Sequence, residues 1–249
     1  MPFSYFGSNI YLDFEAYFFE RNNEKLLVQQ DFLYLNDFPS IFLPRKKENW
    51  INSSVMFTTK EDRERVKEEK ISILVETPVG TEFFYNTADF TNPKRDLKTR
   101  INSFVKNYSF TLNNIYDKDD VLFFYDFWKK QRAHESLTFE ESEEFFMFCL
   151  DNIKKYNIQQ VYVEIGGRLA GLAWGVRLKN NWVGLHLKVD YQYKGLSRFL
   201  HSERAKLFKD CGFFTLGTGA YDSGIESYKK ELGPIRTTDY SYILTSPKT

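Results

Sequence analysis

Apolar positions change their spacing sharply around residues 189–197. Trp182–Val189 is read as a strand, whereas the run 196–211 carries its apolar residues at helical spacing and ends at Gly212. The six residues Gln-Tyr-Lys-Gly-Leu-Ser at 192–197 join the two patterns through a predicted tight turn. A strand, a turn and a helix in this order direct unpaired backbone N–H groups and the positive helix end at one point, which favours binding of a phosphate group.

The same type of pattern predicts the remaining elements of the second half of the chain. From residue 119 onward the expected order is helix, helix, strand, strand, strand, helix, strand, helix and strand. Thr138 and Glu141 have the spacing of a capping box at the start of the second helix, and Gly166-Gly167 predicts a hairpin between strands 161–165 and 169–176. We therefore expect a mixed α/β fold with a largely antiparallel sheet.

The first half is less regular. Strands are expected within residues 25–43, and Pro78-Val79-Gly80 predicts a turn between strands 71–76 and 82–85. The charged run 61–70 predicts a solvated helix. Asn92-Pro93 predicts the start of another helix. Its expected apolar face holds Leu97, Ile101, Phe104, Val105 and Tyr108, and its basic residues, which either form a solvated face or meet phosphates, are Lys94, Arg95, Lys98 and Lys106.

Composition narrows the class of protein. The chain has 249 residues, of which 42% are hydrophobic and 18% aromatic, and this excludes a disordered protein. Lys+Arg and Asp+Glu are equal at 34 each, so no overall basic field requires nucleic acid. Cys149 and Cys211 are expected to be reduced core thiols, and the three histidines lack metal-site spacing. Without an apolar run of about 20 residues, we expect no membrane span and a cytoplasmic protein.

The motif at 192–197 resembles the pyrophosphate-binding sequence Gln/Arg-x-x-Gly-x-Gly/Ala of the GNAT acyltransferases, with Ser197 in place of the last small residue. The predicted order of elements is also the GNAT order. This resemblance implies an acyl donor held at the turn, such as acetyl-CoA or another acyl-CoA. The residues implied for the donor site are Lys188, Val189, Gln192, Lys194, Gly195, Leu196, Ser197 and Lys230.

Residues 70–249 resemble one branch of that superfamily, the proteins related to the catalytic domain of phosphatidylglycerol lysyltransferase (DUF2156-like), which carry two GNAT-like halves in tandem. The resemblance rests on 73–85, on Arg100-Ile101-Asn102-Ser103-Phe104 and on a C-terminal pattern that includes Gly217, Asp222 and Pro234. It implies an N-terminal half at 1–108 and a C-terminal half with the donor site at 109–249. Thr218 and Ala220 depart from the family's Asn and Glu.

The resemblance also implies catalytic residues. His186 is expected to act as general base, with Glu164 and Asp190 as alternatives, because an imidazole titrates near neutral pH. Tyr228 is expected to protonate the leaving group and Asp222 to orient an amine acceptor. Each of the three also has a structural interpretation: His186 as a strand histidine, Tyr228 as a core aromatic residue and Asp222 as a turn residue.

Two functions follow as hypotheses. The first is an acyltransferase or aminoacyltransferase without a metal. It would move its group from acyl-CoA or aminoacyl-tRNA to a small-molecule or lipid acceptor with an amine or hydroxyl group. The second is a catalytically degenerate GNAT module that binds tRNA or a nucleotide, and it is motivated by Ser197, Thr218 and Ala220.

Overall fold

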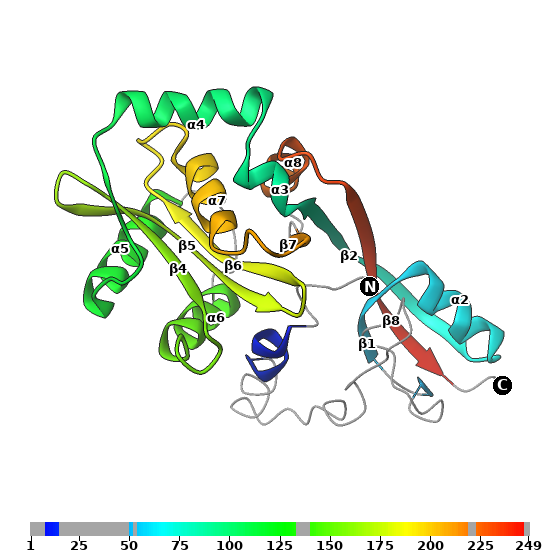
Figure 1. The fold of residues 1–249 in the computed structure, drawn as a ribbon. Helices are drawn as coiled ribbons and strands as arrows, with labels where there is room; N and C mark the ends of the chain where they lie inside the picture. Colours follow the sequence, from blue (N-terminus) through cyan, green and yellow to red (C-terminus); the bar gives the residue numbers. More distant parts are fainter. Residues whose placement is uncertain (1–7, 15–49, 52–53, 133–139, 219–222, 247–249) are drawn as a thin grey trace. The chain divides into compact units, whose positions relative to one another are not determined.

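The computed structural model describes residues 8–14, 50–51, 54–132, 140–218 and 223–246 (Figure 1). The chain forms two compact units, one of residues 1–84 with 215–249 and one of residues 85–214. These units divide the chain differently from the expected halves, because the last strand pairs with an early one and residues 85–108 join the later elements. The strands expected within 25–43 and the capping box at Thr138 lie outside the described residues.

The first unit contains an antiparallel sheet in which β8 lies between β1 and β2. Its elements are β1 (Ser54–Thr58), α2 (Lys60–Glu68), β2 (Ser72–Asn86), α8 (Ser223–Glu231) and β8 (Arg236–Ser246). The predicted charged helix is confirmed as α2. It begins at a capping box in which Thr59 accepts from the Asp62 N–H group and the Asp62 carboxylate accepts from the Thr59 N–H group.

The predicted hairpin around Pro78-Val79-Gly80 is wrong, because β2 is one continuous strand. β8 pairs with it from Ser72 to Phe84, and the pairing register shifts between Pro78 and Gly80. Proline has no N–H group and is tolerated at such a bulge. Gly80 has φ of 144°, and a Cβ atom there would lie 3.3 Å from Cβ of Thr218. The Pro-Val-Gly sequence therefore bends a strand instead of reversing it.

The second unit contains an antiparallel sheet in the order β3-β4-β5-β6. Its strands are β3 (Thr111–Asn113), β4 (Gln159–Ile165), β5 (Arg168–Leu178) and β6 (Asn181–Val189). Gly166 and Gly167 have φ of 60° and 74°, the positive values that a two-residue type I′ turn requires, so the predicted hairpin is confirmed. The short edge strand β3 has no counterpart in the sequence prediction.

The helices of the second unit are α3 (Thr87–Thr91), α4 (Arg95–Asn107), α5 (Lys118–Gln131), α6 (Glu140–Asp151) and α7 (Leu196–Lys206). Strand β7 (Phe213–Thr218) then passes from the second unit into the first. The order α5-α6-β4-β5-β6-α7-β7-α8-β8 is the predicted one. Helix α4 begins at Arg95 and not at Pro93, because Asn92 ends α3, and Val105 on α4 is 48% exposed instead of buried.

The two faces of β6 meet different helices. Val189 belongs to a cluster shared by α4, α7 and the sheet, and α7 lies across this face in Figure 1. The buried members of the cluster are Ile101, Phe104, Val161, Val163, Ala170, Ala173, Val189, Leu196, Phe199 and Leu200. His186 and Lys188 point to the opposite face, since side chains alternate along a strand, and aromatic residues of α5 and α6 cover them. Cys149 and Cys211 are free and buried, as predicted.

Candidate functional site

The predicted strand, turn and helix start are confirmed at the end of β6, but α7 ends at Lys206 and not at Gly212. Gly195 precedes α7 with φ of 89°, in the left-handed region, and no side chain caps this helix end. The N–H groups of Lys194, Gly195 and Ser197 make no hydrogen bond within the described part of the chain. Unpaired N–H groups at a helix N-terminus are the feature that attracts an anion.

Helix α4 covers this turn. A Cβ atom on Gly195 would lie 2.7 Å from the backbone oxygen of Arg100 and 3.2 Å from Cβ of Phe104. The Phe104 and Phe199 rings lie 4.9 Å apart, so α4 and α7 share a packed interface, and Figure 1 shows α4 lying over the turn. The motif glycine is therefore required for the close approach of two backbones, whether or not a phosphate binds.

Replacing Gly195 by alanine is expected to lower the free energy of unfolding by about 3 kcal/mol. About 1–2 kcal/mol comes from the left-handed conformation, and the rest from the contact with Arg100. Gly167→Ala is the matched control, because Gly167 also has positive φ but an added Cβ atom there has no neighbour within 4 Å. Urea unfolding of both variants measures the difference. Equal losses would show that α4 does not restrict the turn.

An acidic side chain already occupies part of the turn. Asp190 accepts a hydrogen bond from the N–H group of Gln192 at 3.1 Å and another from its side-chain amide at 2.5 Å. Gln192 is therefore engaged with Asp190, and the carboxylate adds negative charge beside the free N–H groups. A doubly charged pyrophosphate would be repelled at this position.

His186 lies under three aromatic rings. It is 6% exposed, and its ring centroid is 5.1 Å from that of Phe145, 5.2 Å from Phe146 and 5.6 Å from Trp174. Burial, followed by repulsion from Lys188, holds the pKa of the imidazole well below its ordinary value, although a hydrogen bond with the Phe145 backbone opposes the shift. The ring is neutral at pH 7, and its Nε2 atom is buried without a hydrogen-bond partner.

Lys188 lies beside His186 on the same face of β6 and is 8% exposed. Its Nζ atom is 3.8 Å from the centroid of the Trp128 ring and 5.8 Å from that of Tyr125. Burial and, secondarily, repulsion from Arg132 lower the pKa of this ammonium to about 7. Of the alternative bases, Glu164 on β4 accepts a 3.4 Å hydrogen bond from the hydroxyl of Tyr116, which lies between β3 and α5.

The other predicted residues belong to the first unit. Tyr228 is half-buried on α8, Lys230 is exposed and pairs with Glu226 at 2.7 Å, and Asp222 lies outside the described residues. The structure thus brings His186, Lys188 and the turn into one unit and leaves Tyr228 and Lys230 in the other. The catalytic roles of His186, Asp222 and Tyr228 stay predictions.

Sequence reasoning missed the burial of Lys229 and Arg204. The Lys229 ammonium donates to the backbone oxygens of Leu216, Gly217 and Thr218 at the end of β7, and burial lowers its pKa to about 7, against the effect of Glu82. Arg204 donates to the backbone oxygens of Trp174 and His186, on β5 and β6. A lysine or an arginine on an amphipathic helix is ordinarily predicted to be exposed. The sequence therefore gives no simple indication that these two side chains are buried and donate to backbone oxygens.

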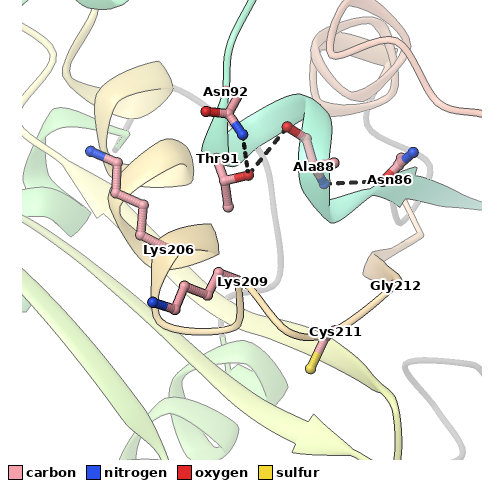
Figure 2. Close-up of a pocket in the computed structure, with 8 residues that line it drawn as sticks. All are labelled: Asn86, Ala88, Thr91, Asn92, Lys206, Lys209, Cys211 and Gly212. Carbon is pink, nitrogen blue, oxygen red and sulfur yellow. Dashed lines mark hydrogen bonds between the residues drawn. The ribbon is translucent and has the colours of Figure 1, made fainter.

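A surface hollow of about 560 Å³ lies in the second unit (Figure 2). Its lining is Asn86, Ala88, Thr91, Asn92, Lys206, Lys209, Cys211 and Gly212. None of the predicted site residues lines it. Within the described ranges, no group of three or more His, Cys, Asp or Glu side chains could hold a metal ion. No described helix is both long and apolar enough to cross a membrane.

Comparison with solved structures establishes the fold. A Bacteroides thetaiotaomicron protein of unknown function is 14% identical, with a TM-score of 0.69 over 78% of this chain and 70% of that one. The C-terminal DUF2156 domain of an Agrobacterium fabrum protein named as a lysylphosphatidylglycerol synthetase is 10% identical, with a TM-score of 0.53 over 76% of this chain and 66% of that one. FemX is 10% identical, with a TM-score of 0.54 over 74% and 69%.

These likenesses confirm the predicted mixed α/β fold with a largely antiparallel sheet. No curated protein matches the chain in sequence. The description "phosphatidylglycerol lysyltransferase, C-terminal" belongs to a family that matches residues 43–234, which is more than half of the chain. The chain is therefore a member of the phosphatidylglycerol lysyltransferase C-terminal family.

Proposed function

We propose that this protein transfers an aminoacyl group from an aminoacyl ester, of the kind that aminoacyl-tRNA carries, to a hydroxyl or amine acceptor. Family membership supports an aminoacyl transfer reaction. The observation that selects this donor over acyl-CoA is the obstructed turn, where α4 approaches Gly195 and Asp190 adds negative charge. The phosphates of a polynucleotide are singly charged diesters, so this donor brings no pyrophosphate to the turn.

The reaction exchanges one acyl bond for another and needs no further reactant. The oxygen or nitrogen of the acceptor attacks the ester carbonyl, the bond from that carbon to the ribose oxygen breaks, and the acceptor's proton ends on the released ribose hydroxyl. The protein has to remove the first proton, supply the second and stabilise the negative oxygen of the intermediate. We assign the proton transfers to the predicted set, with His186 as base and Tyr228 as acid.

An assay with two donors tests this proposal. Lysyl-tRNA carrying radiolabelled lysine and acetyl-CoA carrying a labelled acetyl group are each incubated with the protein and vesicles that contain phosphatidylglycerol or an amine acceptor. We expect label from the tRNA to enter the acceptor and label from acetyl-CoA to stay in the donor. Transfer from acetyl-CoA alone would overturn the donor assignment. Binding of tRNA without any transfer would favour the alternative of a non-catalytic binding module.

The catalytic assignment has its own variants. Tyr228→Phe removes one hydroxyl group and is expected to lower kcat about a hundredfold, which is a typical loss for a general acid. Tyr156→Phe makes the same chemical change at a position outside the proposed site and should leave kcat unchanged. Undiminished turnover in both Tyr228→Phe and His186→Gln would remove these residues from the mechanism without affecting the fold.

A further inference from the structure

The face of β6 that meets α5 holds an excess of hydrogen-bond donors and positive charge. The Lys188 ammonium makes no hydrogen bond or ion pair with any residue that the structure describes, and its contacts there are the rings of Trp128 and Tyr125. The Arg132 guanidinium lies 5.3 Å from the same Trp128 ring. Two cations therefore share one aromatic ring.

Neutral donors nearby also lack partners. The Nε2 atom of Gln131 and the hydroxyl of Tyr125 are both buried with no hydrogen bond in the described part of the chain. Gln131 itself is held in place, because its Oε1 atom accepts from the N–H group of Tyr191 at 3.0 Å. Tyr125, Trp128 and Gln131 follow one another at intervals of three along α5, so they lie along one side of the helix, toward β6.

Lys188 is a largely buried cation, and its contacts with the rings offset only part of the cost of removing the ammonium from water. Buried charges in proteins are otherwise paired, and buried donors are otherwise hydrogen-bonded. The missing partner must accept hydrogen bonds and carry negative charge. At the end of α5, Gln131 and Arg132 are half-buried, and Tyr191, whose N–H group donates to Gln131, is exposed.

We propose that the α5-facing side of β6 is a binding site for a singly charged oxyanion, a carboxylate or a phosphodiester, held by Lys188 Nζ and Gln131 Nε2 beside Trp128. Single charge fits because Lys188 is the buried one of the two cations at the Trp128 ring, while Arg132 is half-buried and Gln131 and Tyr125 contribute neutral donors. The Asp190 carboxylate near the same end of β6 is already engaged with Gln192 and disfavours a second charge on the ligand. This proposal concerns binding and does not depend on the transfer reaction.

The test follows the indole N–H resonance of Trp128 by NMR, assigned with Trp128→Phe. Dimethyl phosphate and acetate are titrated separately at about pH 6, where the Lys188 ammonium is charged, with chloride keeping the ionic strength constant. A saturable shift with either probe supports the site and identifies whether it prefers a phosphodiester or a carboxylate. The absence of a saturable shift with both probes overturns the proposal.

Three variants show whether Lys188 and Gln131 hold the ion. Lys188→Met should weaken binding about thirtyfold, as expected for loss of a buried charge pair. Lys130→Met removes an exposed lysine of α5 and should leave the affinity unchanged. Gln131→Glu keeps the acceptor for Tyr191 and adds a carboxylate beside Lys188, so it should abolish binding even if Lys188→Met does not fold. Wild-type affinity in either Lys188→Met or Gln131→Glu would refute the assignment.

Discussion

Replacing Arg204 by methionine is expected to lower the free energy of unfolding by about 3–5 kcal/mol. Arg204 is 1% exposed, and its Nη1 atom donates to the backbone oxygen of Trp174 at 2.9 Å and to that of His186 at 3.1 Å. These two oxygens lie where the pairing of β5 with β6 shifts, between Ala173 and Gly175. Methionine fills a similar volume but leaves both acceptors buried and unpaired, at about 1–3 kcal/mol each.

Arg177→Met is the control for this prediction. Arg177 pairs with Asp210 at 2.7 Å on the surface, where an ion pair contributes about 0–1 kcal/mol. Urea unfolding followed by far-UV circular dichroism measures both variants. If Arg204→Met unfolded within about 1 kcal/mol of the wild type, the two oxygens would have found other donors, and Arg204 would not position the strand that carries His186 and Lys188.

The sequence predicted the elements of the second half well because their information is local. Gly166-Gly167 specifies its hairpin through the positive φ that two adjacent residues need, and the segment Trp182–Val189 is a strand, as predicted. The Pro78–Gly80 prediction failed for the opposite reason. Whether such a sequence reverses the chain or bends a strand depends on β8, a partner more than 150 residues away, which pairs with β2 on both sides of the bulge.

The site was predicted only in part, for a related reason. The motif at 192–197 correctly indicated a turn with free N–H groups before α7. It could not indicate that α4 would rest on Gly195, because a glycine needed for a phosphate and a glycine needed for a helix contact look alike in sequence. Whether Lys188 is buried likewise depends on which helix covers its face of β6, and whether Arg204 is buried depends on which face of α7 meets the sheet.

The protein is also expected to become more stable as the pH rises from about 7 to about 9.5, in part through Lys188. The pKa of Lys188 is lowered to about 7 in the folded protein, against 10.5 for an ordinary lysine. Below pH 7 the ammonium is charged in both states and its burial cost is fully present. Between the two pKa values the unfolded chain binds one more proton than the folded one, so stability rises by about 1.4 kcal/mol per pH unit.

Lys188→Met isolates this contribution from that of Lys229, whose pKa is lowered to about 7 in the same way. Urea unfolding at several pH values should give a slope of stability against pH that is about 1.4 kcal/mol per unit smaller in the variant. In the described part of the chain, the groups that interact with Lys188 are Arg132, His186, Tyr125 and Trp128, and none of them carries a carboxylate. Measurements stop near pH 9.5 because tyrosines titrate above it, and burial raises the pKa of Tyr125 in the folded state. Equal slopes in both proteins would mean that an acceptor within the chain already keeps Lys188 charged, and the proposed oxyanion would then have no unpaired cation to bind.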